Sequence, residues 1–244
     1  MMHRSIVLSL ALGLSLNAAS QAAKPSKTPK AKPAEPAATT TDSSAIQPPS
    51  PPPAEPVAPA PPPAIPKPAS KPIPSGPSFT DSRDGKPYAM VTIGDRMWMA
   101  ENLDFKTDPS QCYENVVKNC EIYGRLYTWK TAQIVCPDGW HLPSDDEFAS
   151  LEKAFGDSAG HQLKASKGWV EGAGSDAVKF SGLPAGNHDK SGYFRELGYA
   201  GGFWTSSDKL VAGGICRQLD SRNAMLQRAT ASKQNGFSVR CVRN

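Results

Sequence analysis

The side chains with the greatest chemical potential in this sequence are its cysteines and histidines, because a cysteine beside a positioned base can form a reactive thiolate. Five cysteines are present, so pairing of four leaves one free, and we expect that one to be Cys216. The histidines of the folded part are His141, His161 and His188, and none forms a local signature with Cys216. His141 lies in a turn motif, where a structural hydrogen bond is expected. We predict no catalytic residue.

Three acidic residues stand together at Asp145, Asp146 and Glu147, and carboxylate oxygens could hold a hard metal ion. They directly follow Ser144, and a serine with a glutamate three residues later is the pattern of a capping box. Acids in a first turn also suit the positive end of a helix. We therefore interpret Ser144 and Glu147 as a helix cap, and we expect no metal and no cofactor.

The best candidate for ligand binding is the polar, glycine-flanked loop 186–195, whose side chains combine aromatic faces with hydrogen-bonding groups. Such side chains on irregular loops suit a carbohydrate or a peptide. The spacing of the nearby acids and amides matches no calcium loop, so we expect binding without calcium. An ordinary polar surface loop is the competing interpretation. The predicted ligand contacts are Asn187, His188, Tyr193 and Arg195.

The elements that position these residues can be read from turn and periodicity signals. Gly94-Asp95 suits a two-residue hairpin turn, and Gly156 suits the end of a helix. The predicted elements are a hairpin of 88–93 and 96–100, a polar loop 114–119, helices at 127–134 and 145–155, and strands at 215–219, 224–230 and 237–242.

This order of elements predicts an α+β fold, with two short helices segregated from a twisted antiparallel sheet and long irregular loops. Every tryptophan, tyrosine, phenylalanine and cysteine lies from Phe79 onward, which predicts one domain over 79–244. We expect the five tryptophans to belong to the core and not to a binding platform. They are Trp98, Trp129, Trp140, Trp169 and Trp204.

The first 78 residues have the composition of a targeting signal and a linker, and we expect no folded domain in them. Residues 1–23 combine Arg4, an apolar run too short for a membrane span, and small residues for cleavage after Ala22 or Ala23, which predicts a signal peptide and export. Residues 24–78 hold 19 of the 24 prolines, so we expect a disordered proline-rich linker. We interpret it either as a spacer that holds the domain away from a surface or as a passive tether. The expected locations are the periplasm, the cell surface or the medium.

The formal net charge of +4 does not indicate a nucleic-acid partner. The excess of Lys and Arg over Asp and Glu lies in the first 78 residues, and the predicted domain is neutral. Nucleic-acid binding requires a basic face on the folded part. We expect no nucleic-acid partner and no membrane span after signal cleavage.

Several short motifs follow one another along the predicted domain: Trp98–Leu103, Cys112-Tyr113, Cys120–Trp129, Cys136–Ser144, Leu183–Gly186, Phe203–Ser207 and Gly236–Val242. In this order they resemble the Fibrobacter succinogenes major paralogous domain over about residues 81–244. That family is similar to the C-type-lectin-like fold and to formylglycine-generating enzymes. The resemblance therefore implies a C-type-lectin-like fold.

The cysteines admit two pairings. We predict Cys112–Cys120 and Cys136–Cys241, while Cys216–Cys241 with a free Cys136 is the alternative. The resemblance favours the first, because in C-type lectins a disulfide joins the early helical region to the last strand. The Glu-Pro-Asn, Gln-Pro-Asp and Trp-Asn-Asp triplets of calcium-dependent lectins are absent, in line with calcium-free binding.

The sequence thus predicts an exported, non-catalytic recognition module that carries a C-type-lectin-like domain on a proline-rich spacer. Its expected partner is an extracellular glycan or an envelope protein, bound without calcium. A structural envelope or surface protein is one alternative. An oxidase similar to formylglycine-generating enzymes, using Cys216, is the other.

Overall fold

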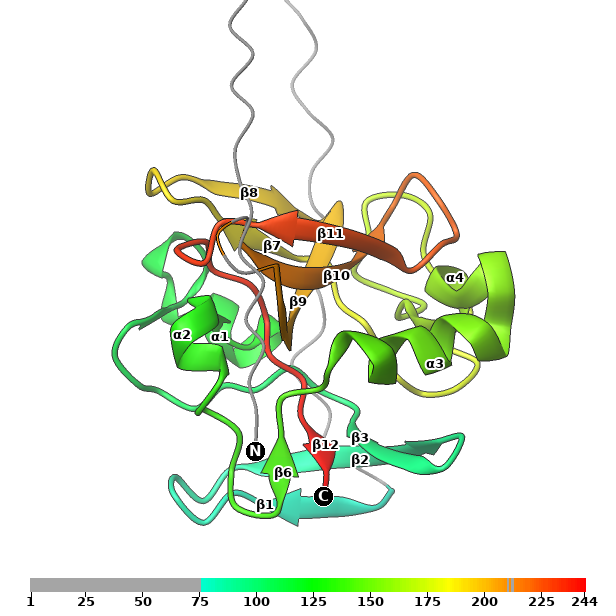
Figure 1. Cartoon of the computed structure of the whole chain (residues 1–244), viewed down its shortest axis with the longest axis horizontal. Coiled ribbons are helices and arrows are strands. Elements are labelled where there is room, and N and C mark those ends of the chain that lie inside the picture. Colours follow the sequence, from blue (N-terminus) through cyan, green and yellow to red (C-terminus); the bar gives the residue numbers. More distant parts are fainter. Residues whose placement is uncertain (1–75, 210, 212) are drawn as a thin grey trace, which may run out of the picture. The chain divides into compact units, whose positions relative to one another are not determined.

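The computed structural model describes residues 76–209, 211 and 213–244. The predicted signal peptide, 1–23, and residues 24–75 of the proline-rich segment lie outside the described residues. Within the described part, none of the helices has the length and apolar character needed to cross a bilayer. The described part is a mixed α+β structure (Figure 1).

The first sheet brings the beginning and the end of the domain together. Its strands, in spatial order, are β1 (Ser78–Thr80), β2 (Pro87–Ile93), β3 (Arg96–Met99), β12 (Val242–Arg243) and β6 (Trp140–His141), and all neighbours are antiparallel. Ile93 pairs with Arg96 across the predicted turn, so the hairpin prediction is confirmed. The last strand is therefore held between a hairpin and the segment that leads into the longest helix.

The second sheet contains the strands that carry the predicted ligand loop. Its order is β11 (Gln227–Ala231), β10 (Gly214–Asp220), β9 (Ala200–Asp208), β7 (Ala185–His188) and β8 (Phe194–Leu197). The expectation of one antiparallel sheet is wrong, since β7 and β9 are parallel and a separate pair joins β4 (Ser110–Gln111) to β5 (Leu126–Tyr127). Gly201 explains the parallel contact, because a Cβ there would collide with the Leu183 backbone oxygen.

The helices differ most from expectation. Four α-helices occur in the described residues in place of two: α1 (Val117–Tyr123), α2 (Trp129–Ala132), α3 (Asp145–Phe155) and α4 (Ala159–Leu163), with 3-10 turns η1 (Tyr113–Asn115) and η2 (Gly156–Ser158). The predicted helix 127–134 is a single turn, and the predicted polar loop 114–119 is largely helical. Helix α1 buries only Cys120 and Tyr123, which is too short a pattern to show periodicity.

Helix α3 follows the sequence signals closely. Ser144 Oγ accepts a hydrogen bond from the Glu147 backbone N–H at 3.1 Å, and Glu147 Oε2 accepts one from the Ser144 N–H at 2.8 Å. These two bonds form the predicted capping box. Phe148 and Leu151 are buried, and Gly156, with a φ of 57°, ends the helix.

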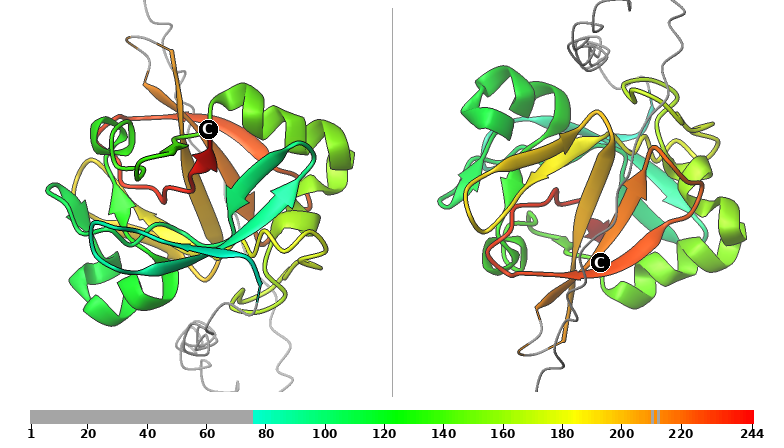
Figure 2. Two further views of the ribbon diagram at one scale, coloured as in Figure 1. Left: turned by 90° about the horizontal axis from the view of Figure 1, so that it is seen from below. Right: turned by 90° about the horizontal axis from the view of Figure 1, so that it is seen from above.

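The closing segment, residues 236–244, runs from the second sheet through the middle of the domain to the first sheet (Figures 1 and 2). The strand predicted at 237–242 is regular only at β12, because its earlier residues bridge different neighbours: Phe237 pairs with Tyr127, and Ser238 with Phe203. The Met99 and Leu103 N–H groups donate to the Cys241 and Val239 carbonyls. The segment thus connects both sheets through its backbone.

Arg240 is the largest polar side chain in this interior. It is fully buried, and its Nη2 donates to Asn102 Oδ1 at 2.7 Å while its guanidinium lies 4.2 Å from the centre of the Phe180 ring. The motif residues Asn102 and Arg240 are therefore paired inside the core.

Trp98, Trp169 and Trp204 are buried as predicted. Trp129 and Trp140 are only half-buried, and they pack against the core cluster that contains Tyr88, Leu103 and Trp204.

Candidate functional site

The four predicted ligand contacts lie on the β7–β8 hairpin. Asn187 pairs with Arg195, and His188 pairs with Phe194, across an antiparallel register. Tyr193 stands in the turn and is 65% exposed. The hairpin therefore presents these four residues along one short ribbon, on two strands and the turn between them.

Asp189 organises the turn of this hairpin. Its Oδ1 accepts the backbone N–H groups of Ser191 and Tyr193 at 2.9 and 3.1 Å, and its Oδ2 accepts Arg195 Nε at 2.8 Å. The Arg195 hydrogen bond, followed by the backbone bond from Tyr193, lowers the pKa of Asp189. The carboxylate is thus occupied in shaping the loop, and it orients Arg195 at the same time.

His188 is an anchoring residue in the structure. Its backbone N–H and oxygen bond to Gly236 at 3.0 and 2.7 Å, and its ring packs 5.1 Å from that of Phe194. These contacts fix the hairpin to the closing segment. Of the four predicted contacts, Arg195 alone lines a depression beside β8.

A depression of about 400 Å³ lies beside β8. Its walls combine aromatic rings with carboxylates and one guanidinium, and the rings of Tyr113 and Phe194 lie 5.1 Å apart. Burial, and then the nearby charge of Glu114, raises the pKa of Tyr113, so its hydroxyl stays protonated at neutral pH. The principal lining residues are Tyr113, Glu114, Phe194, Arg195, Glu196 and Tyr199.

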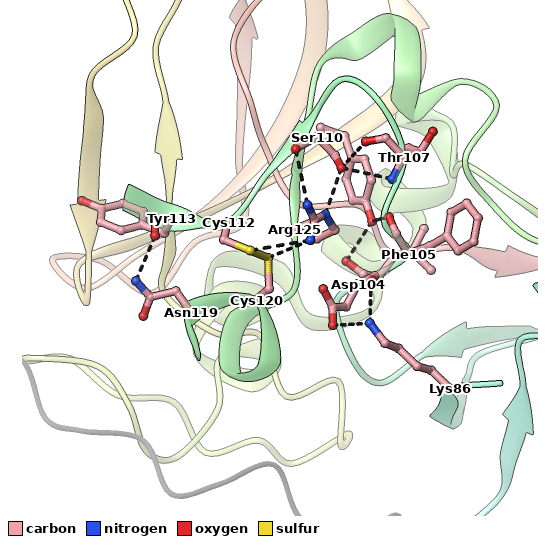
Figure 3. Close-up of a disulfide and its surroundings, with 12 residues drawn as sticks. Lys86, Asp104, Phe105, Thr107, Ser110, Cys112, Tyr113, Asn119, Cys120 and Arg125 are labelled. Carbon is pink, nitrogen blue, oxygen red and sulfur yellow. Dashed lines mark hydrogen bonds and ion pairs between the residues drawn. A yellow bond between two sulfur atoms is a disulfide. The ribbon is translucent and has the colours of Figure 1, made fainter. Parts of the chain in front are cut away.

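The backbone that follows Tyr113 has an unusual conformation. Glu114 and Asn115 have φ values of 54° and 58°, a left-handed conformation that few non-glycine residues adopt. The Asn119 side chain donates to the Tyr113 carbonyl at 3.0 Å (Figure 3). Gly186 makes room for the ring, because a Cβ there would lie 2.7 Å from Tyr113 Cε2. The segment is held in a bent form that places the ring against β7.

All five cysteines lie in the described residues. Disulfides join Cys112 to Cys120 and Cys136 to Cys241, and Cys216 is free, which is the pairing preferred from the sequence. Cys216 is fully buried, and burial raises the pKa of its thiol to about 12. A thiol in this environment stays protonated at neutral pH, and thiolate chemistry requires the opposite shift.

Two of the three acids in the first turn of helix α3 are engaged in protein contacts. Asp145 binds Arg217 at 2.7 Å and Arg228 at 2.6 Å, and Glu147 binds His141 Nε2 at 2.9 Å and Arg96 at 3.0 Å. Over the described part of the chain, no group of three or more His, Cys, Asp or Glu side chains has an arrangement that could hold a metal ion. This cluster therefore fixes the start of the helix.

Residues 91–243 match the model of the Fibrobacter succinogenes major domain. The chain belongs to this family. The match begins inside β2 and ends with β12, so it includes the whole second sheet and the depression, while β1 of the first sheet precedes it. No curated protein and no solved structure matches the chain significantly.

Within this Fibrobacter succinogenes major domain, Tyr113 is the one residue of the short motifs that lines the depression beside β8. Trp204 Nε1 donates to the Tyr127 carbonyl at 2.7 Å, which joins two motifs inside the core. Phe194, Glu196 and Tyr199 lie between motifs, and sequence reasoning missed all three as site residues. A usable signal was present, since Phe194 and Tyr199 stand close to Gly192 and Gly198 in a glycine-rich stretch of the sequence.

Proposed function

We propose that this protein is an exported, non-catalytic recognition module whose depression beside β8 binds a glycan without calcium. The observation that carries the proposal is the lining itself, in which three aromatic rings stand among two carboxylates and one guanidinium. Aromatic faces pack against the apolar faces of sugars, and carboxylates accept hydrogen bonds from their hydroxyls. A concave site with few convergent polar groups is the usual form of a binding site.

A non-catalytic role is supported by the environment of the free thiol. Cys216 lies in the core, where its sulfur is 3.8 Å from the Ala229 oxygen and 3.9 Å from Gln218 Nε2. An oxidase that uses Cys216 needs an accessible thiolate, and burial opposes both requirements. Replacing Cys216 by Ser would abolish activity only if the oxidase alternative were correct.

A C-type-lectin-like arrangement and an exported location complete the proposal. The last strand lies in the same sheet as the first hairpin, and the disulfide Cys136–Cys241 ties the helical region to the chain's end. Two disulfides suit an oxidising compartment, and residues 1–23 have the sequence pattern of a secretion signal. The proline-rich segment then acts as the spacer that carries the domain.

The proposal is tested by screening the exported chain against a glycan array in the presence of EDTA. Tyr199→Ala removes a ring from the depression, and we expect about tenfold weaker binding to any glycan retained. Tyr193→Ala removes a ring from the exposed turn nearby and is the matched control, because Tyr193 is not among the lining residues. Binding that depends on Tyr193 and not on Tyr199 would place the site on the turn.

The screen also separates recognition from a structural role in the envelope. A recognition module retains a glycan or one extracellular protein in EDTA, with an affinity that falls in Tyr199→Ala. A structural envelope protein retains no glycan, and it co-purifies with envelope components whether or not Tyr199 is present. The second pattern would overturn the proposed function.

A further inference from the structure

A second depression, of about 480 Å³, lies against the Cys112–Cys120 disulfide. Figure 3 shows Arg125 and Ser110 beside this disulfide, with Lys86 in contact with Asp104 farther along the same side. The described residues that line the depression include three cations and no aromatic ring. Its chemistry therefore differs from that of the depression beside β8, which is lined by three rings.

Arg125 is held in place without a carboxylate partner. Its Nε donates to Ser110 Oγ at 2.9 Å, and its Nη1 lies 3.4 and 3.6 Å from the two disulfide sulfurs, which are weak acceptors. Within the described residues, no carboxylate approaches Arg125 to ion-pair distance. This guanidinium is fixed in orientation and still lacks its preferred partner.

Other arginines of the domain show what such a partner contributes. Arg83 binds Asp81 at 2.7 Å, Arg195 binds Asp189 at 2.8 Å, and Arg217 binds Asp145 at 2.7 Å. A planar guanidinium matches a carboxylate geometrically, and these charge-assisted bonds are roughly twice as strong as neutral ones. Arg125 has the same chemistry and is half-buried in the wall of a depression, which favours an anionic group from a ligand.

The net charge of the lining favours the same kind of group. Lys106 is exposed beside Arg125 in the lining, and Lys86 Nζ neutralises Asp104 by contacting its Oδ2 at 2.7 Å. Glu121, the other acid of the lining, is paired with Lys118 at 2.6 Å. Lys106 and Arg125 therefore remain as the cations available to an incoming anion.

Two amide side chains add hydrogen-bonding groups to the lining. Gln111 and Asn115 both line the depression. An amide can donate to a hydroxyl oxygen and accept from a hydroxyl group. The depression thus combines cations for a carboxylate with amides for hydroxyls.

We propose that this depression binds an acidic sugar, a uronic acid unit, with its carboxylate on Arg125 and Lys106 and its ring hydroxyls hydrogen-bonded to Gln111 and Asn115. A uronic acid carries both groups on one small ring, whereas an acidic peptide supplies carboxylates without neighbouring hydroxyls. This site is separate from the proposed glycan site beside β8, and it recognises its ligand by charge and hydrogen bonds without stacking.

The test is calorimetric titration of the exported chain with an oligogalacturonate, with the same oligosaccharide after reduction of its carboxyls to alcohols, and with hexaglutamate. We expect the oligogalacturonate to bind about tenfold more tightly than either of the others, with an affinity that falls as salt rises. Equal binding of the acidic and the reduced sugar would overturn the proposal, and so would tighter binding of hexaglutamate.

Variants locate the site. Arg125→Gln should weaken oligogalacturonate binding about tenfold, and Lys106→Gln should weaken it about threefold. Lys153→Gln removes an equally exposed cation from helix α3 and should change nothing. If Arg125→Gln fails to fold, Lys106→Gln decides the question, because substitution of this exposed side chain leaves the fold intact. Unchanged oligogalacturonate affinity in Lys106→Gln would overturn the proposal.

The two proposed sites can fail independently. Tyr199→Ala should leave oligogalacturonate affinity unchanged, since Tyr199 does not line the Arg125 depression. A loss of oligogalacturonate binding in Tyr199→Ala, with Arg125→Gln unaffected, would move acidic-sugar binding to the depression beside β8. That result would overturn this inference and would support the proposed function.

Discussion

The two disulfides of the domain connect very different distances along the chain. Cys136–Cys241 joins residues 105 positions apart, while Cys112–Cys120 joins residues 8 positions apart. The long connection lies in the core cluster that contains Trp204 and Phe237. The short connection lies in the wall of the Arg125 depression. One disulfide therefore closes the fold, and the other shapes a small region of its surface.

The short disulfide carries more of the candidate chemistry. The segment between its cysteines supplies Tyr113 and Glu114 to the depression beside β8, and the sulfurs themselves contact Arg125. Near the long disulfide, the neighbouring groups are apolar core side chains and backbone pairs of β12. One disulfide therefore supports the fold and the other supports the proposed sites, so each can be removed without the other.

Removal of the long disulfide should have the largest effect. The paired variant Cys136→Ala with Cys241→Ala restores the loop entropy of about a hundred residues to the unfolded chain, about 4.7 kcal/mol on the loop-closure model. That loss is a large fraction of the stability of an ordinary domain. We expect urea denaturation to show a midpoint shifted far down or a domain that no longer folds.

The short disulfide provides the matched control for this measurement. If the variant without Cys136–Cys241 were no less stable than the variant without Cys112–Cys120, the division into a fold-closing and a surface-shaping disulfide would be wrong. The free energies of unfolding of both variants should be measured by urea denaturation at the same pH. The two disulfides differ in their surroundings as well as in loop length, and a common pH keeps those surroundings in the same charge state.

Removal of the short disulfide should lower the free energy of unfolding less than removal of the long disulfide does, and it should lower ligand affinity more. Cys112→Ala with Cys120→Ala frees a loop of eight residues, about 2.5 kcal/mol on the same model. The left-handed backbone at Glu114 and Asn115 then loses its covalent support, so Tyr113 is no longer held against Gly186. We expect the folded variant to lose affinity about tenfold at both depressions, as measured with the ligands proposed above.

This comparison fails if the folded variant without Cys112–Cys120 binds like the wild type. In that case the hydrogen bond from Asn119 to the Tyr113 carbonyl and the Ser110 contact of Arg125 would suffice to position both sites. The variant Asn119→Ala in the disulfide-free background would then show which support remains.

The part of the structure that was predictable from the sequence is the part with strong local signals. Gly94-Asp95 has the geometry that a two-residue hairpin turn demands, and the hairpin forms there. Ser144 and Glu147 satisfy each other's backbone, and helix α3 begins after them. Both features depend on residues within four positions of one another, so the surrounding fold has little opportunity to override them.

The candidate sites were less predictable because they depend on contacts between distant segments. Tyr113 and Phe194 are 81 positions apart, yet their rings pack 5.1 Å from each other. Helix α1 has no capping side chain and contains two buried residues, so nothing in its sequence marked it. The predicted contact Arg195 lines the depression while its Nε donates to Asp189 Oδ2, and Asp189 lies outside the lining. Such placements follow from tertiary packing and leave no periodic pattern.

Polar contacts near the long disulfide test how far it acts alone in holding the end of the chain. His141 Nε2 lies 2.9 Å from Glu147 Oε1, and His141 Nδ1 lies 2.7 Å from Asn244 Oδ1. Glu147→Gln removes the charge from this chain of contacts and weakens the capping box. We expect a loss of about 1 kcal/mol in the free energy of unfolding, which is the scale of a helix cap.

The pH dependence of that loss identifies its cause. Burial alone would raise the pKa of Glu147, but hydrogen bonds from the Ser144 backbone and from His141 outweigh it and lower the pKa. A carboxylate with a lowered folded-state pKa stabilises the fold above its unfolded pKa of about 4.3, and this stability disappears as pH falls through the folded value. The part of the difference between wild type and Glu147→Gln that comes from the Glu147 charge should therefore shrink as pH falls below about 4. Asp146→Asn removes an exposed carboxylate from the same helical turn and is the control. A difference that does not change with pH would mean that the shape of the cap, and not its charge, secures this end of the domain beside Cys136–Cys241.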